Sequence, residues 1–200
     1  MTNSEAIIDL ARQTGFVTTR AVRARGIAPY ALQRLTERGT LERVARGVYV
    51  LVDTPPITEH VTLIEACLRV PTGVICLLSA LRFHGLTTQL PHAIWMAIDR
   101  KAWLPNVEYP PLRIVRFSGT ARTTGIEEHI VSGETIRVYS IAKTVADCFK
   151  YRNTVGLDVA IEALADAWRG RRTTMDALWQ AAKVDRVAAV MRPYLESVAA

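Results

Sequence analysis

The chain has 200 residues, of which 50% are hydrophobic and 22% are charged. These proportions exclude a disordered chain, and the length suits one compact domain or a small domain followed by a larger one. The formal net charge is +6. A basic protein attracts polyanions, so nucleic acid is the first class of partner to consider.

The cysteines and the apolar segments indicate where the protein resides. Cys67, Cys76 and Cys148 form no Cys-x-x-Cys pair, and their odd number favours buried free thiols in a reducing compartment. The first residues lack the basic and apolar regions of a signal peptide, and the apolar stretch 74–81 is too short to cross a bilayer. We therefore expect a cytoplasmic protein without contact to membranes.

The first forty residues predict three short helices. The first begins after Asn3 or Ser4, either of which is a suitable N-cap, and ends at Gly15. The second begins after Thr18 and ends at Gly26.

The third helix runs from Pro29 to Gly39, because proline suits a first helical turn and glycine suits a helix end. Leu32 and Leu35 have the spacing of its buried face.

An alternating pattern follows the third helix. Apolar residues at Leu41, Val44, Val48 and Val50 predict two short strands around the turn Ala45-Arg46-Gly47. Three helices followed by a hairpin are the layout of a winged helix-turn-helix, which we assign to residues 1–53. Pro55-Pro56 interrupts regular structure, and a second domain is predicted over 57–200.

The second domain reads as mixed α and β, so the fold class is α+β: a winged helix-turn-helix followed by a larger α/β domain that ends in helices. Helices are predicted over 58–69 and 73–84, and strands over 93–98 and 112–117. A hairpin over 126–131 and 135–138 turns at Ser132-Gly133. Three or four helices complete the chain, with N-caps at Ser140, Thr173 and Asp185 and breaks at Gly156 and Gly170.

Positive charge is concentrated in the predicted winged helix. In residues 1–52, eight arginines against four acidic residues give +4, and lysine is absent. Arginine makes planar, bidentate contacts with phosphate and guanine, so this composition favours DNA binding. The alternative is a solvated surface on which the arginines pair with Glu37 and Glu42.

The third helix is the expected recognition helix. With its leucines buried, Tyr30, Gln33, Arg34, Glu37 and Arg38 face outward. Gln33 is suited to adenine and Arg34 to guanine in the major groove.

Further contacts to the DNA backbone are expected at two other places. Thr18, Thr19 and Arg20 lie at the start of the second helix, where we expect free N–H groups to meet a phosphate. Arg43 and Arg46 lie at the hairpin, where a wing meets the backbone or the minor groove.

Several runs of residues carry a resemblance to a known family. In the first domain they are Arg25-Gly26-Ile27, Leu35 and the run from Gly39 to Tyr49. In the second domain they are Leu78 to Leu86, Val138 to Arg152 and Gly156 to Leu164. With these runs the sequence resembles the AbiEi family of antitoxin-type transcriptional regulators of type IV toxin–antitoxin systems.

The resemblance implies a repressor that binds repeats in the promoter of its own operon. It also implies that the second domain counteracts a nucleotidyltransferase-like toxin, directly or indirectly. Winged-helix proteins often bind repeats as homodimers, and a homodimer on DNA is one possibility here, although no dimer interface can be recognised in the sequence.

Candidate catalytic patterns are incomplete, so we expect no enzyme, no cofactor and no metal. Asp99 and Lys101, after a strand, make half of a metal-dependent nuclease site, and a DNA-directed nuclease is one alternative function. Ser140 and Lys143 have the spacing found in serine acyl enzymes. The sequence favours a different role for each: Ser140 as an N-cap and Lys143 as the i, i+4 partner of Asp147. His84 reads as a helix-end residue.

The second alternative is a protein-binding adaptor whose winged helix docks protein. The loop Trp103-Leu104-Pro105 is poor in polar residues and is a candidate edge for protein docking.

Overall fold

The computed structural model describes residues 2–53, 59–131 and 134–199. The chain divides into two compact units, Met1–Pro71 with His129–Ile136 and Thr72–Glu128 with Arg137–Ala200. The predicted break at Pro55-Pro56 and the predicted turn at Ser132-Gly133 lie outside the described residues. The domain limits 1–53 and 57–200 stay predictions, and the first unit also includes helix α4 (Glu59–Arg69).

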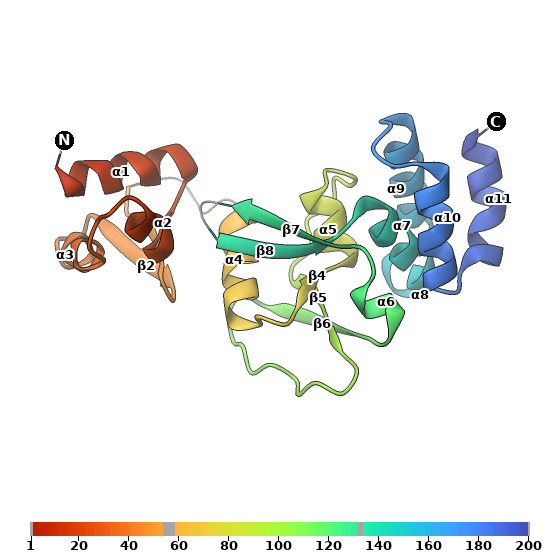
Figure 1. The fold of residues 1–200 in the computed structure, drawn as a ribbon, viewed down its shortest axis with the longest axis horizontal. Helices are drawn as coiled ribbons and strands as arrows, with labels where there is room; N and C mark the ends of the chain where they lie inside the picture. Colours follow the sequence, from red (N-terminus) through yellow and green to blue (C-terminus); the bar gives the residue numbers. More distant parts are fainter. Residues whose placement is uncertain (1, 54–58, 132–133, 200) are drawn as a thin grey trace. The chain divides into compact units, whose positions relative to one another are not determined.

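The N-terminal domain, residues 2–53, combines three helices with a three-stranded antiparallel sheet (Figure 1). Strand β3 lies in the middle of the sheet, between β1 and β2. The helices and the hairpin follow one another in the predicted order, so the winged helix-turn-helix is confirmed. The elements are α1 (Asn3–Thr14), β1 (Val17–Thr18), α2 (Thr19–Ala24), α3 (Tyr30–Glu37), β2 (Leu41–Ala45) and β3 (Val48–Leu51).

The first helix begins one or two residues earlier than predicted. Thr2, and not Asn3 or Ser4, is the N-cap: its side chain accepts from the backbone N–H of Glu5, and the Glu5 carboxylate accepts from the backbone N–H of Thr2. This reciprocal capping box satisfies two donors at once, which explains why Thr2 is the cap. Gly15 ends the helix as predicted, with φ of 79°.

The core of the N-terminal domain joins all three helices to the sheet. Leu32 and Leu35 of α3 are buried as predicted, at 0% and 3% exposure. They share one apolar cluster with side chains of α1, α2 and β2, including Ile7, Val22 and Leu41. Because α3 is anchored through this face, its opposite face is turned to solvent.

The hairpin is short and irregular. Arg43 pairs with Tyr49 and Ala45 pairs with Val48, so the register shifts between Arg43 and Ala45. An extra residue of this kind increases the local twist of a hairpin. The turn itself is Arg46-Gly47, and Gly47 has φ of 80°, a conformation in which glycine avoids strain.

The rest of the chain forms a five-stranded mixed sheet in the order β6-β5-β4-β8-β7, together with helices. Strand β5 runs parallel to β6 and antiparallel to β4, and β4 runs parallel to β8. The elements after α4 are β4 (Val74–Ile75), α5 (Leu77–Phe83), β5 (Ile94–Asp99), β6 (Leu112–Phe117), α6 (Thr120–Thr123), β7 (Ile126–Val131), β8 (Glu134–Tyr139), α7 (Ile141–Lys150), α8 (Arg152–Val155), α9 (Leu157–Arg169), α10 (Met175–Val184) and α11 (Ala188–Ala199).

The strands are confirmed, whereas one helix needs correction. The predicted helix over 73–84 begins as strand β4, the central strand of the sheet, and only residues 77–83 are helical. The β-branched pair Val74-Ile75 suits a buried strand, and its apolar run cannot be distinguished from a helix by periodicity alone.

The caps of the final helices also differ from prediction. Ser140 caps α7 as predicted, but Thr174, and not Thr173, caps α10. Asp185 is the C-cap of α10 and starts no helix; its side chain is buried instead.

The core of the second unit joins the sheet to the final helices. Figure 1 shows α7 to α11 gathered into one bundle, and α7 packs against α5, α9 and α10. Side chains from strands and helices share one apolar cluster, including Phe117, Tyr139, Phe149, Leu164 and Leu178. None of the described helices is long and apolar enough to cross a membrane.

The glycine before β7 offers a test of this packing. Gly125 has φ of 74°, and a Cβ added there would lie 2.8 Å from the Cβ of Lys143. Gly85 has a similar φ of 63°, but a Cβ added there would meet nothing within 4 Å. We expect Gly85→Ala to destabilise the protein by about 1 kcal/mol through backbone strain, and Gly125→Ala by about 3 kcal/mol because overpacking adds to the strain. Chemical denaturation measures both, and equal losses would contradict this packing.

Candidate nucleic-acid interface

The exposed face of α3 presents the predicted base-reading side chains together. Tyr30 is 63% exposed, and Gln33, Arg34, Glu37 and Arg38 are exposed as well. The Nε2 of Gln33 donates to Oε1 of Glu37 over 3.0 Å, one helical turn away. The acidic residue of α3 is thus paired with the glutamine, and this pair fixes the amide of Gln33 on the surface.

The start of α2 is fastened to the hairpin turn. The backbone N–H of Thr19 donates to the carbonyl of Gly47 over 2.8 Å, and its hydroxyl lies 3.4 Å from the same oxygen. Arg20 and Arg46, the neighbours of these two residues, are both exposed. The contact therefore brings the predicted backbone-binding residues of α2 and of the hairpin into one group.

Thr18, which was predicted to contact DNA, stabilises the start of α2 from inside the domain. It is fully buried, and its hydroxyl accepts from the backbone N–H of Ala21 over 3.0 Å, which confirms it as the N-cap of α2. The expectation of free N–H groups at this helix end needs correction, since the N–H groups of Thr19 and Ala21 are already bonded. The side chains of this group, rather than these two amides, are turned to solvent.

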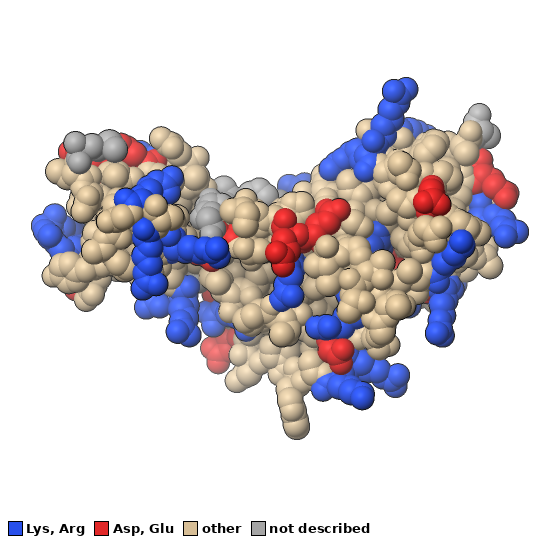
Figure 2. All heavy atoms as spheres, in the orientation of Figure 1, with Lys and Arg blue, Asp and Glu red and all other residues tan. Residues whose placement is uncertain are grey.

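The arginines of the domain lie on its surface. All eight are exposed, and the surface formed by α2, α3 and β2 carries many basic side chains in Figure 2. Arg12 pairs with Asp9 at 3.6 Å. Within the described residues, Arg20, Arg34, Arg38 and Arg46 have no carboxylate within 4 Å. Their charge is available to an anionic partner.

The comparisons with known proteins bear on this domain directly. Residues 5–52 match the model of a family described as a transcriptional regulator, AbiEi antitoxin. The match covers nearly all of the N-terminal domain, so this domain is similar to the regulators of that family. Comparison with the curated proteins gives no match.

A solved structure shares the fold of this chain. It is the crystal structure of the RV2827C protein from Mycobacterium tuberculosis, with 14% sequence identity and a TM-score of 0.52. The similarity covers 98% of this chain and 81% of that one. At this identity the likeness concerns the fold, and it extends over both parts of the chain.

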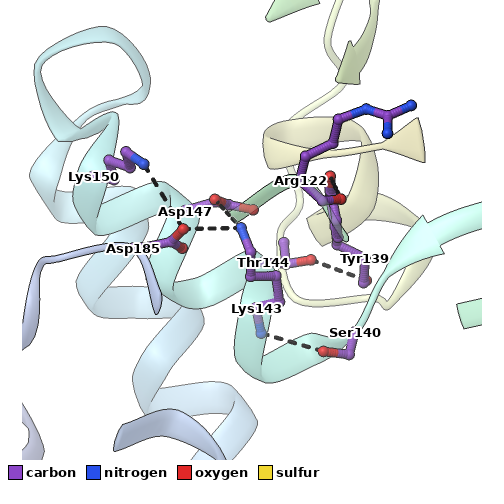
Figure 3. Close-up of polar contacts among 8 residues, drawn as sticks. All are labelled: Arg122, Tyr139, Ser140, Lys143, Thr144, Asp147, Lys150 and Asp185. Carbon is purple, nitrogen blue, oxygen red and sulfur yellow. Dashed lines mark hydrogen bonds and ion pairs between the residues drawn. The ribbon is translucent and has the colours of Figure 1, made fainter. Parts of the chain in front are cut away.

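The second unit contains a buried ionic cluster (Figure 3). Lys143 of α7 is 1% exposed, and its Nζ lies 2.5 Å from Oδ1 of Asp147 and 3.1 Å from Oδ1 of Asp185. The half-exposed Lys150 approaches Asp185 at 3.9 Å. The rings of Phe117 and Tyr139 lie 4.8 and 4.7 Å from the same Nζ. The cluster joins α7 to the end of α10.

Burial dominates the electrostatics of this cluster. It raises the pKa of Asp147 well above its ordinary value, against the attraction of Lys143 and with the added repulsion of Asp185. Burial likewise raises the pKa of the Cys76 and Cys148 thiols, so neither is a reactive thiolate. Cys67, which was also expected to be buried, is only half-buried.

His84, Ser140 and Lys143, which the sequence analysis weighed as catalytic candidates, make contacts that stabilise the fold. The Nε2 of His84, at the end of α5, lies 2.7 Å from the carbonyl of Tyr139. Ser140 accepts from the backbone N–H of Lys143, whose amine reaches the two aspartates instead of the serine.

Asp99 is also engaged in local contacts. It accepts from the backbone N–H of Lys101 and lies 3.7 Å from Nε of Arg122. In the part of the chain that the structure describes, no three His, Cys, Asp or Glu side chains gather as a metal site would need.

Half of the buried cluster is predictable from the sequence. The i, i+4 spacing predicts the pair of Lys143 and Asp147, which the structure confirms. Asp185 was missed, because its place before a helix reads as an N-cap and no local pattern links it to α7. Arg23 on α2 and Arg25 at its C-cap are exposed; both are counted in the charge of the domain but are not placed in the predicted site.

The buried cluster predicts a contrast between two lysines. Lys143→Met leaves two buried carboxylates without their nearest cation, so we expect a loss of about 3–5 kcal/mol in the free energy of unfolding. Lys150→Met removes a partly exposed cation at 3.9 Å and should cost under about 1 kcal/mol. Denaturant titration of both variants measures the difference. A Lys143→Met protein as stable as the parent would show that the cluster contributes little.

Proposed function

We propose that the protein is a sequence-specific DNA-binding repressor of its own operon, with α3 as the helix that enters the major groove. The observation that carries the proposal is the exposed face of α3, which presents Gln33, Arg34 and Arg38 on an AbiEi-type domain. The two arginines have no carboxylate partner among the described residues, so they meet DNA without first breaking an ion pair.

The roles of the side chains follow from their chemistry. Arg34 is suited to the two acceptors of guanine, and Gln33 to adenine. Gln33 is held by Glu37 at 3.0 Å, so reading adenine requires it to exchange that bond for contacts with the base. Tyr30, in the first turn of α3, and Arg38, its C-cap, flank these residues and are suited to phosphates.

The hairpin and the start of α2 supply the backbone contacts in this proposal. Arg46 lies beside Gly47, whose carbonyl is bound by Thr19, and Arg20 follows Thr19 on α2. Arg43 on β2 is also exposed. Because the Thr19–Gly47 contact holds the turn in place, these arginines approach the phosphates as one preformed group. Thr18 supports the group from within as the cap of α2.

Two arginine variants separate base reading from backbone binding. We expect Arg34→Ala to lower affinity for the specific site by about 1–3 kcal/mol and to relax the preference at one base pair. Arg46→Ala should weaken specific and scrambled DNA about equally and reduce the slope of log K against log salt by about 1. Fluorescence anisotropy with duplexes from upstream of the operon, at several salt concentrations, measures both effects.

Arg12→Ala is the matched control, because Arg12 is exposed on α1 and paired with Asp9. It should leave specificity unchanged. Absence of binding at low salt by the folded protein would overturn the repressor and favour a winged helix that docks protein.

We further propose that the second domain neutralises a nucleotidyltransferase-like toxin by direct contact through the loop after β5. Trp103 is 96% exposed and Leu104 is 66% exposed. Tryptophan is among the residues enriched in binding hot spots, and the exposed leucine adds apolar surface beside it. The loop stem is fixed, since Nη1 of Arg116 donates to the carbonyls of Arg100 and Ala102, each over 2.8 Å. A fixed stem lowers the entropy lost when the loop binds a partner.

The double variant Trp103→Ala/Leu104→Ala tests this contact. We expect it to lose protection against the cognate toxin in a co-expression growth assay, because the apolar anchors are gone, while its DNA affinity stays within twofold of the parent. Leu157→Ala, which removes an exposed leucine elsewhere in the unit, is the control. Full protection by the double variant would rule this loop out as the toxin contact.

In this proposal the protein acts in the cytoplasm by binding rather than by catalysis, and it occupies promoter repeats as a homodimer. Asp99, the acid of the alternative nuclease site, is engaged by Arg122 and the Lys101 amide, which supports binding over cleavage. Magnesium-dependent cleavage of plasmid DNA, lost in Asp99→Ala, would restore the nuclease alternative.

A further inference from the structure

A pocket lies where α9 turns into α10, far along the chain from the proposed DNA-binding residues. It has a volume of about 540 Å³ and is lined by Trp168, Arg169, Arg171, Thr173 and Val198. These residues come from the end of α9, the turn that follows it and the end of α11. Pockets of several hundred cubic ångströms are the size that small-molecule ligands occupy.

The charge of this pocket is positive and unneutralised. Arg169 and Arg171 are exposed, and within the described ranges neither has a carboxylate within 4 Å. Figure 2 shows basic side chains at this end of the helical bundle. Arg172 is different, because its Nη1 donates to the carbonyl of His84 and so holds the turn against α5. The guanidinium groups of Arg169 and Arg171 are therefore available to an anionic ligand. They lie on or beside a turn that Arg172 holds in place.

The rest of the lining adds a flat apolar surface and a hydroxyl. Trp168 is half-buried, so part of its indole is accessible in the pocket. Thr173 is also half-buried and supplies a hydrogen-bonding hydroxyl. Guanidinium groups bind phosphate in a bidentate manner, and an indole is a suitable surface for a stacked base. An anion with an aromatic ring satisfies both features.

We propose that this pocket binds a free nucleotide, with its phosphates on Arg169 and Arg171 and its base against Trp168. A nucleotide matches the pocket in size and carries both required groups on one small molecule. The proposal goes beyond DNA binding by the N-terminal domain and does not depend on it.

The backbone at Arg171 allows a substitution that removes the side chain without harming the fold. Arg171 has φ of 52°, in the left-handed region where glycine is favoured. Arg171→Gly should therefore fold at least as well as the parent. Arg186 has a similar φ of 60°, is exposed and does not line this pocket, so Arg186→Gly loses the same charge from an equivalent backbone position.

Isothermal titration calorimetry of the full chain with ATP tests the proposal. We expect measurable binding that weakens at least tenfold in Arg171→Gly and in Arg169→Ala and stays within twofold of the parent in Arg186→Gly. Thermal melts of the two glycine variants should show no loss of stability. Adenosine and tripolyphosphate, each carrying only one of the two groups, should bind at least tenfold more weakly than ATP.

Three results would overturn the nucleotide assignment. The first is the absence of heat with ATP at millimolar concentration, and the second is equal weakening in Arg171→Gly and Arg186→Gly. The third is tripolyphosphate binding as tightly as ATP, which would indicate a simple anion site without base stacking. If an oligonucleotide binds through these arginines and ATP does not, the pocket serves nucleic acid and the proposal fails as well.

Discussion

The burial of Leu32 and Leu35 is the constraint on which the N-terminal domain depends. Both side chains enter one apolar cluster with α1, α2 and β2, so the rotation of α3 about its axis is fixed. Replacing either leucine with alanine would cost about 2–5 kcal/mol, far more than any surface contact of α3 contributes. The side chains on the opposite face are consequently free to vary in chemistry without altering the fold.

The other parts of the proposed DNA-binding surface are positioned by bonds to the backbone rather than by pairs of side chains. The Thr19–Gly47 bond joins α2 to the hairpin, and the Thr18 hydroxyl caps α2 from within the core. Helix α2 has six residues and strand β3 has four, and elements this short are only marginally stable by themselves. These contacts therefore help to hold both elements in place. A preformed surface of this kind lowers the entropy cost of binding a rigid duplex.

The second unit is organised around a different interaction, the buried contact of Lys143 with Asp147 and Asp185. Buried charges are costly unless they are paired, so this contact favours one way of packing α10 on α7 over others. The apolar cluster around it provides most of the burial, while the ionic contact specifies the arrangement. The exposed Trp103 loop and the pocket at Trp168 lie on the surface of the unit that this core supports.

The sequence predicts the elements whose signals are local. The spacing of Leu32 and Leu35, the glycines at helix ends and the spacing of Lys143 and Asp147 all depend on neighbours within one turn or two. The capping box at Thr2, the strand at Val74-Ile75 and the burial of Asp185 were missed. The last two depend on pairing with residues distant in the sequence, which periodicity does not encode. The roles of the exposed arginines remain predictions, since exposure shows availability and not contact.

The central claim is that the outward face of α3 reads a DNA sequence. In vitro selection from a pool of random duplexes, with the full chain as bait, tests it because the pool contains every candidate operator. We expect the pool to converge on one motif and the Arg34→Ala protein to lose selection for a guanine within it. A pool that stays random after repeated selection, with a folded protein that retains the duplexes, would contradict sequence reading by α3.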